Sequence, residues 1–379
     1  MTRRLLLIGG GHSHVEVIRR FGIAPEPGVS VTLISPEQHT PYSGMLPGYI
    51  AGHYRFADCH IDLDALCRHA GLVRIEGAVN HIDFAHRAAG CDNGVEQCFD
   101  VVSIDTGATP VTAAIPGADR HGIPVKPVSP FLGAWASMRA AARQSTEEIR
   151  IVIVGAGAGG IELALAMHHR LRTDSCRAQF TVISDSPSIL PAHPSGVQRR
   201  LQRILRARGI TVQLNAPVER AESAGLLLRD GTLVPADHVV WVTGAGAPAW
   251  PRTSGLQTDD AGFIAVNGHL QSMSHDCVFA SGDVASMVAT PRPKSGVYAV
   301  RQGPPLTENL RRALRGEPLL TYRPQHTALA LISAGNRYAV ASYGPLAIGG
   351  AWVWRWKNRI DTRFMLQYST TAGAVVPRR

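Results

Sequence analysis

Paired cysteines are missing from this 379-residue chain. Its six cysteines are scattered, and none stands in a Cys-x-x-Cys pair or at the spacing of metal ligands. This pattern argues against a disulfide framework and against a zinc site. A pairing of Cys59 with Cys67 is an open but disfavoured alternative. We therefore expect free thiols and no bound metal.

Long apolar runs are also missing. No run approaches the roughly 18 apolar residues that a membrane-spanning helix needs. Arg3 and Arg4 precede only four apolar residues, which are too few for a signal peptide. Charged residues make up 18% of the chain and hydrophobic residues 45%, a balance that excludes a disordered chain. We expect a cytoplasmic protein with a large packed core.

Glycine and positive charge are abundant. The 38 glycines fall in clusters, which indicates places where the backbone closely approaches a ligand. The net charge of +9 favours anionic partners such as phosphorylated ligands, nucleic acid or an acidic membrane surface. Because the charge is spread along the chain and no nucleic-acid-binding module is recognisable, we expect no nucleic-acid partner.

Two segments repeat the order strand, glycine turn, helix, strand. One begins with the apolar run 5–8 and the other with 151–154, and a glycine-rich turn follows each run. In such a βαβ unit the backbone N–H groups and the helix dipole bind the pyrophosphate of a dinucleotide. The alternative is a glycine turn that only allows the helix and the strand to pack closely.

The two turns match the G-x-G-x-x-G pattern to different degrees. The matching glycines are Gly9 and Gly11 in the first turn and Gly155, Gly157 and Gly160 in the second. The first turn has His14 in the third place. The acidic ribose contact expected about 20 residues later is replaced by Ser35 and Ser184. Ser184 favours NADPH over NADH, because it removes a repulsion against a 2′-phosphate. Asp185 as the ribose ligand and a second unit that binds no nucleotide are the alternatives.

Short apolar strands separated by helices predict parallel sheets covered on both faces. The expected fold class is α/β, with two Rossmann-like dinucleotide-binding domains, the first of them discontinuous. A Pro-rich stretch at 116–130 reads as a linker, and the turn-rich stretch at 248–262 returns the chain to the first domain. The expected boundaries are 1–118 and 262–320 for the first domain, 119–261 for the second, and 321–379 for a small C-terminal region.

Further motifs follow the later strands. They are Asp105–Pro110, Gly155–Glu162, Thr243-Gly244 and Gly282-Asp283. In this order the motifs resemble the two-dinucleotide-domain flavoproteins, which include pyridine nucleotide–disulfide reductases, type II NADH:quinone oxidoreductases and sulfide:quinone reductases. The segments 12–14, 40–47 and 298–303 are most similar to the flavoprotein unit found fused to selenide, water dikinase.

The resemblance implies FAD in the first domain and NAD(P)H as co-substrate in the second. Ser35 would contact the adenosine ribose, and Asp283 would bind the ribityl chain or a pyrophosphate-bound water. The alternative for Asp283 is a helix N-cap. The other residues implied at FAD are Gly9, Gly11, His12, Ser13, His14, Pro41, Thr106, Gly107, Gly282 and Gln302. Those implied at NAD(P)H are Gly155, Gly157, Gly160, Ser184 and Gly244.

Three charged residues are the candidates for catalysis. The resemblance implies that Lys294 reaches the flavin, where a cation near the N1–C2=O edge favours reduction, and Lys126 is the second candidate. Glu162 corresponds to a carboxylate near the contact of nicotinamide and flavin. The alternatives are solvated surface charges for the lysines and a first-turn glutamate stabilised by the helix dipole for Glu162.

The loop 40–47 lacks the cysteines that the disulfide and sulfide reductases use. This absence favours direct flavin chemistry, in which hydride passes from NAD(P)H to FAD and then to a quinone-like or other small acceptor. One alternative is a flavin oxidase or dehydrogenase that acts directly on a small substrate and has a vestigial nicotinamide domain. Another is a redox accessory protein that handles selenium or sulfur.

The stretch 352–365 interleaves aromatic and basic residues. Basic aromatic helices of this kind lie on anionic membranes, which would make the protein peripheral to the inner face of the membrane. The alternative is a capping helix that packs over the flavin domain or a homodimer interface. The alternation of Trp352, Trp354 and Trp356 fits a strand as well as a helix, so the membrane-binding helix and the packed alternative both remain open.

Overall fold

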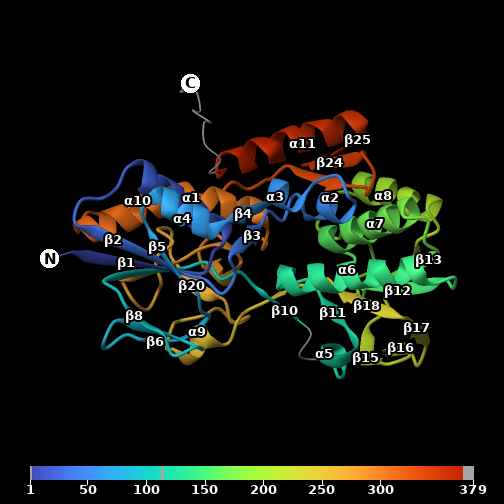
Figure 1. The fold of residues 1–379 in the computed structure, drawn as a ribbon, viewed down its shortest axis with the longest axis horizontal. Coiled ribbons are helices and arrows are strands. Elements are labelled where there is room, and N and C mark those ends of the chain that lie inside the picture. The colour runs from blue at the N-terminus through green and yellow to red at the C-terminus, as the bar shows by residue number, and fades with distance from the viewer. Residues whose placement is uncertain (1, 112–114, 370–379) are drawn as a thin grey trace.

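The computed structural model describes residues 2–111 and 115–369. Two five-stranded parallel sheets dominate it, each flanked by helices (Figure 1). The first has the strand order β21-β9-β1-β2-β5. Its strands are β1 (Arg3–Ile8), β2 (Val29–Ile34), β5 (Val73–Ile75), β9 (Val101–Ile104) and β21 (Val278–Ala280). The edge strand β21 therefore comes from a segment that follows the whole second sheet in the chain.

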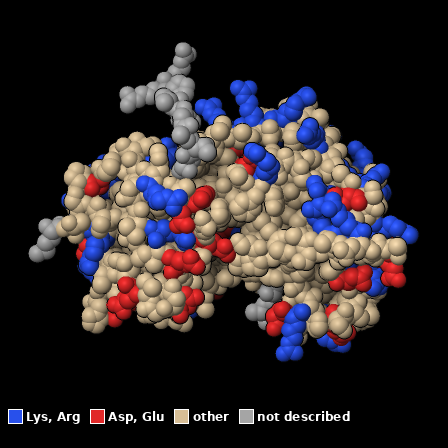
Figure 2. All heavy atoms as spheres, in the orientation of Figure 1, with Lys and Arg blue, Asp and Glu red and all other residues tan. Residues whose placement is uncertain are grey.

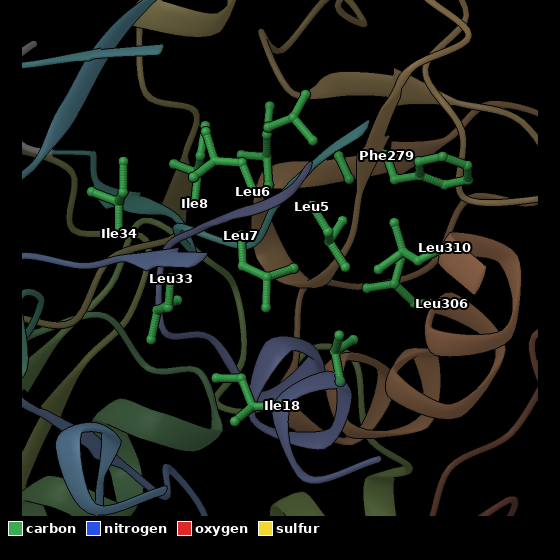
Figure 3. Packing of buried hydrophobic residues seen from close by; sticks show 14 of the residues in the cluster. Leu5, Leu6, Leu7, Ile8, Ile18, Leu33, Ile34, Phe279, Leu306 and Leu310 are labelled. Atoms are coloured by element: carbon green, nitrogen blue, oxygen red, sulfur yellow. The ribbon is translucent and has the colours of Figure 1, made fainter. Parts of the chain in front are cut away.

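The core of the first sheet lies between its strands and the helices α1 (His12–Ile23) and α10 (Gly296–Arg315) (Figure 3). All four residues from Leu5 to Ile8 are at most 1% exposed, because β1 lies in the middle of the sheet and both faces of the sheet are covered. Each such side chain contributes roughly 1.5–3 kcal/mol by leaving water. This burial explains why the apolar run is continuous instead of alternating.

The second sheet repeats this architecture with the order β11-β18-β12-β13-β14. Its strands are β11 (Ile123–Pro124), β12 (Ile149–Val154), β13 (Ala178–Ile183), β14 (Thr211–Gln213) and β18 (His238–Trp241). Its helices are α6 (Val128–Gln144), α7 (Ala158–Thr173) and α8 (Ser195–Ala207). The predicted α/β fold with two βαβ units is confirmed. Residues 116–130, expected as a linker, contain β11 and the start of α6.

Each parallel sheet is interrupted in the chain by a three-stranded antiparallel sheet, which is inserted before β9 in the first unit and before β18 in the second. The first of these is β6 (Val79–Asp83), β7 (Ala88–Cys91) and β8 (Glu96–Cys98); the second is β15 (Val218–Glu222), β16 (Gly225–Leu228) and β17 (Leu233–Pro235). The two units therefore share more than the βαβ motif. The short strands β10 (Thr109–Pro110) and β19 (Ala245–Gly246) pair where the chain crosses between them.

Short elements complete the two units. They are β3 (His39–Pro41), β4 (His60–Asp62), β20 (Ile264–Val266), β22 (Ala285–Met287), α2 (Leu46–Ile50), α3 (Phe56–Cys59), α4 (Leu63–Ala70), α5 (Ala118–His121), α9 (Trp250–Thr253) and the 3-10 turn η1 (Gly282–Val284). The strand β3 and the helix α2 carry the loop 40–47.

The C-terminal region is an antiparallel sheet followed by one long helix. Its elements are β23 (Ala330–Ser333), β24 (Ala339–Tyr343), β25 (Leu346–Gly350) and α11 (Ala351–Leu366). The stretch 352–365, whose sequence fits a helix and a strand equally well, is thus a helix. It lies along the edge of the molecule, above α2 and α3 in the view of Figure 1. Among the described residues, no helix is long and apolar enough to cross a bilayer.

Candidate functional site

The first glycine turn leaves no room for side chains. A Cβ on Gly9, whose φ is +90°, would lie 2.5 Å from the carbonyl oxygen of Asp105, and a Cβ on Gly11 would lie 2.2 Å from its carboxyl carbon. Gly11 is also the N-cap of α1, so the helix N-terminus points out of the turn. This is the geometry that a dinucleotide pyrophosphate requires.

Asp105 lies directly beneath this turn and is 2% exposed. Its Oδ2 accepts hydrogen bonds from the backbone N–H groups of Ser13 (2.9 Å) and His14 (3.4 Å) in the first turn of α1. Burial raises the pKa of the carboxyl to about 7, against the effect of these two hydrogen bonds. The sequence analysis placed Asp105 at a strand end and assigned it no role.

The side chains of the His12–His14 segment point in different directions. The two ring nitrogens of His14 contact the Gly9 carbonyl (2.7 Å) and the Ser103 hydroxyl (2.8 Å), and the Ser13 hydroxyl donates to the Ala299 carbonyl. The side chains of His14 and Ser13 therefore face the protein. The Nε2 atom of His12 is buried and has no hydrogen-bond partner within the described chain. Burial lowers the pKa of His12 to about 4, so its ring is neutral.

Two more features of this region fit a bound group. Within residues 2–111 and 115–369, the hydroxyl of Ser281 is a second buried polar atom without a partner. Gly107 has a φ of +74°, and a Cβ there would meet nothing within 4 Å. Orphaned polar atoms and open space above a glycine are expected where a ligand supplies the missing contacts. The residues present therefore fit a dinucleotide such as FAD.

The second glycine turn is built in the same way. Gly155 has a φ of +116°, and a Cβ on Gly160 would lie 1.8 Å from the Gly155 carbonyl oxygen, so close packing of α7 on β12 requires both glycines. A Cβ on Gly157 or Gly244 would meet nothing within 4 Å, which leaves the helix N-terminus open. Ser184 follows β13 directly, and its hydroxyl accepts from the Ser186 N–H at 3.2 Å.

Asp283 connects predicted residues from three segments. Lys126 Nζ lies 3.0 Å from its Oδ2, and Gln302 accepts from the N–H of the preceding Gly282 at 2.7 Å. Lys294 donates to the Ala285 carbonyl, and its Nζ lies 3.9 Å above the ring of Phe263. Burial lowers the pKa of Lys294, and the charge of Asp283 opposes this shift. The structure thus gathers both candidate lysines around Asp283.

Glu162 lies on α7 and faces the C-terminal region. Its Oε1 accepts from the Ser333 N–H at 2.7 Å. Burial raises the pKa of Glu162 to about 7, Lys357 opposes this shift, and Asp361 adds to it. Lys357 is 8% exposed and its Nζ donates to Asp361 at 2.7 Å and to the Gly44 carbonyl at 2.6 Å. A carboxyl group that titrates near neutral pH is therefore coupled to a buried ion pair.

Aromatic rings connect this ion pair to the first glycine turn. Tyr42, in the loop 40–47, stacks on Phe364 of α11 with ring centroids 4.3 Å apart, and His12 lies edge-on to Tyr42 at 5.6 Å. Burial and the carboxylate of Asp361 raise the pKa of Tyr42. The helix α11 therefore covers the His12 side of the first dinucleotide turn.

The chain contains only three lysines, Lys126, Lys294 and Lys357, among 38 basic residues. All three lie at the sites just described. Lys357 was not among the predicted site residues, and the scarcity of lysine in the sequence is the signal that could have found it.

The remaining predicted residues lie nearby. Ser35, 3% exposed, follows β2 directly, and its hydroxyl donates to the Glu37 carbonyl at 3.1 Å. Pro41 ends β3 and precedes Tyr42. Thr106 and Gly107 follow Asp105 at the carboxyl end of β9, the edge at which parallel sheets bind their ligands.

All six cysteines are free thiols, which excludes the Cys59–Cys67 alternative. Burial raises the pKa values of Cys59 and Cys67 to about 12, so neither is a thiolate near neutral pH. Within residues 2–111 and 115–369, no three His, Cys, Asp or Glu side chains are grouped to hold a metal ion.

Comparison with known proteins places this geometry in a family. The family model for pyridine nucleotide-disulphide oxidoreductases matches residues 3–303. Demethylphylloquinone reductase NdbB of Synechocystis is 25% identical over 91% of this chain and 89% of its own length. A type II NADH:quinone oxidoreductase of Staphylococcus aureus is 20% identical over 95% of this chain and 94% of its own. The solved sulfide:quinone oxidoreductase of Aquifex aeolicus superposes with a TM-score of 0.80 at 18% identity, covering 97% of this chain and 91% of that one.

The chain belongs to the pyridine nucleotide-disulphide oxidoreductase family. The family resemblance seen in the sequence is confirmed. The protein is an FAD-dependent oxidoreductase with NAD(P)H as its reductant.

Proposed function

We propose that this oxidoreductase reduces a membrane quinone that approaches beneath α11. The observation that carries the proposal is the coupling of Glu162 to the Lys357–Asp361 pair, under a helix with an apolar and basic outer face. Quinone-reducing activity in the names of the relatives from Synechocystis and Staphylococcus supports it. The acceptor is expected to meet the flavin on the side that α11 covers.

The two glycine turns would hold the two dinucleotides. Gly9, Gly11 and the N-terminus of α1 would hold FAD, and Gly155, Gly157 and the N-terminus of α7 would hold NAD(P)H. When bound, FAD would supply the hydride and electron chemistry that links the nicotinamide to the acceptor. Lys126 and Lys294 would orient the flavin end of FAD through the charge cluster at Asp283.

Glu162 would supply a proton. A hydride equivalent carries two electrons and one proton, so the reduction of a quinone to a quinol needs one further proton. A carboxyl group with a pKa of about 7 is well placed to donate that proton near neutral pH. Lys357 is the buried cation beside it, and Asp361 holds its Nζ in place. After turnover, Glu162 would be reprotonated from solvent.

The outer face of α11 matches a membrane surface. Trp352, Trp356 and Ile360 recur every four residues and remain 50%, 41% and 41% exposed. The parallel stripe Arg355, Arg359 and Arg363 lies beside them on the helix. Figure 2 shows basic side chains projecting along the edge that α11 forms in Figure 1. Such a helix lies flat in an anionic interface, so we place the protein at the inner face of the membrane.

An anaerobic absorbance titration with NADH and with NADPH, followed by a soluble short-chain quinone, tests the proposal. We expect the flavin to bleach within seconds with one nucleotide and to return to its oxidised spectrum when the quinone is added. A flavin that bleaches but ignores the quinone would overturn the assignment of the acceptor. A flavin that resists both nucleotides would favour the vestigial-domain alternative, to which the serine at position 184 points.

The proton-donor role of Glu162 predicts a selective kinetic defect. In Glu162→Gln, reoxidation of the reduced flavin by the quinone should slow about 100-fold. Reduction of the flavin by NAD(P)H should slow less than that. In the wild type the reoxidation rate should fall above about pH 7, because only the protonated carboxyl donates. Stopped-flow measurements on both half-reactions provide the test, with the surface variant Glu308→Gln as control. Equal slowing of both half-reactions would contradict the role.

A further inference from the structure

The N-terminus of α1 already holds a negative charge of the protein's own. Asp105 Oδ2 accepts from the N–H groups of Ser13 and His14, two of the donors that an incoming pyrophosphate also seeks. The N–H of the preceding residue, His12, has no acceptor within the described chain. A dinucleotide bound at this turn therefore meets one free donor and two that Asp105 occupies.

Glycines fit closely around this carboxyl group. A Cβ on Gly11 would lie 2.3 Å from each carboxyl oxygen of Asp105, and a Cβ on Gly282 would lie 2.3 Å from its Oδ1. These glycines belong to the two segments expected to contact FAD. The side chain is thus enclosed in the turn itself and cannot withdraw without moving both segments.

The groups that surround Asp105 provide little compensating charge. On α1, the rings of His12 and His14 are neutral, since burial lowers the pKa of each to about 4. From η1, Asp283 faces it with a charge of the same sign, and Lys126 pairs with Asp283. From α10, Gln302 is uncharged. A pyrophosphate would add two further negative charges beside an ionised Asp105.

We propose that Asp105 couples the binding of FAD to the uptake of one proton. In the free protein the ionised carboxylate caps α1. When the pyrophosphate arrives, one proton from solvent adds to a carboxyl oxygen, and the neutral acid remains in the turn beside the phosphates. The proposal rests on the assignment of FAD to the first glycine turn.

The cost of this protonation is small near neutral pH. Burial outweighs the hydrogen bonds from Ser13 and His14 and brings the pKa of Asp105 to about 7, so the carboxyl group is ionised in the free protein above this pH and is neutralised at little cost close to it. The phosphate charges then favour the neutral form. By linkage, affinity for FAD must fall as pH rises above this value, by at most about tenfold per pH unit for one proton.

The test is the affinity of the FAD-free full-length protein for FAD between pH 6 and pH 9, from the quenching of flavin fluorescence. We expect Kd to rise about tenfold per unit above pH 7 in the wild type. Asp105→Asn should bind FAD with the same Kd across this range. The control Asp100→Asn, at the start of the strand that ends before Asp105, should keep the wild-type slope.

A second readout keeps the proposal testable if Asp105→Asn does not fold. Titration calorimetry of the wild type in two buffers of different ionisation enthalpy counts the protons taken up per FAD at pH 8, and we expect a value close to one. A count of zero, or a Kd independent of pH, would overturn the coupling and leave the FAD site intact. Absence of FAD binding at every pH would instead overturn the proposed function.

Discussion

A lysine and an arginine carry the same charge, but only the lysine readily loses its proton. This chain contains only three lysines, and each of them has a specific partner. Lys126 pairs with Asp283, Lys357 pairs with Asp361, and Lys294 lies over an aromatic ring. At the scale of single residues, we therefore expect substitutions of Lys126 and Lys294 to change flavin chemistry, and substitution of Lys357 to lower stability as well, because it would leave Asp361 buried without its partner.

Lys294 is expected to stabilise the reduced flavin by its positive charge. Lys294→Met should lower the two-electron reduction potential of the bound flavin by about 30 mV, the equivalent of about 1.4 kcal/mol. Spectroelectrochemical titration measures the shift. Lys294→Arg keeps the charge and should stay close to wild type. An unchanged potential in Lys294→Met would assign the lysine a packing role against Phe263.

Ser184 is expected to make the second dinucleotide site tolerant of a 2′-phosphate. Ser184→Glu places a carboxylate where that phosphate would lie, so kcat/KM for NADPH should fall at least about tenfold relative to NADH. Steady-state kinetics with both nucleotides checks the ratio, and Ser184→Thr is the uncharged control. A ratio that stays constant would show that the adenosine ribose lies elsewhere.

Sequence reasoning found the residues of the site where a motif is local. The glycine turns, Asp283 and Gln302 come from short patterns whose backbone geometry is dictated by neighbouring residues. Asp105 was missed as a functional group because its effect depends on a helix almost one hundred residues away. Glu162 was found, but its partner Lys357 belongs to an element that no pattern connects to α7.

At the scale of elements, α11 brings two functions together. Its inner face supplies Lys357, Asp361 and Phe364, and its outer face carries exposed tryptophans. The sequence left this stretch open between helix and strand, because alternating tryptophans fit both periodicities. Burial of residues 353, 357, 361 and 364 follows the helical spacing. The helix α10 was not predicted either, since Pro304 and Pro305 lie within it and normally end a helix.

The outer face of α11 predicts binding to vesicles. The triple variant Trp352→Gln, Trp356→Gln, Ile360→Gln should float with anionic vesicles at least about tenfold less than wild type, because it loses most of the apolar area that inserts. Its activity with a soluble quinone should remain, since the inner face is unchanged. A flotation assay with neutral vesicles as control gives the measurement. Unchanged flotation, with a loss of dimers in light scattering, would identify the face as a homodimer interface.

At the scale of the whole molecule, the two parallel sheets and their antiparallel sheets follow one plan. The sequence predicted the two parallel sheets, because each βαβ unit is encoded in about thirty consecutive residues, but not the antiparallel sheets. The position of the C-terminal region against α7 could not be predicted, since it depends on contacts between segments far apart in the chain. The covering of the first glycine turn by α11 could not be predicted for the same reason.

Buried neutral histidines predict acid sensitivity of the fold. Burial and the nearby Arg208 lower the pKa of His168 to about 4, while an unfolded histidine binds a proton near pH 6.5. The unfolded chain therefore gains protons first, and stability falls between pH 6.5 and pH 4. Tm should drop less from pH 7 to pH 5 in His168→Gln than in wild type or in the exposed control His86→Gln. An equal drop in all three would rule out this contribution.

The scarcity of lysine has a practical consequence for labelling. A reagent that acylates amines finds, besides the N-terminus, only the three side chains at the sites described. Lys126, whose side chain is 45% exposed, would react first, and bound FAD would shield it. Peptide mapping of one such reaction would thus report whether the cofactor is bound in a crude preparation, without purification and without any assay of turnover.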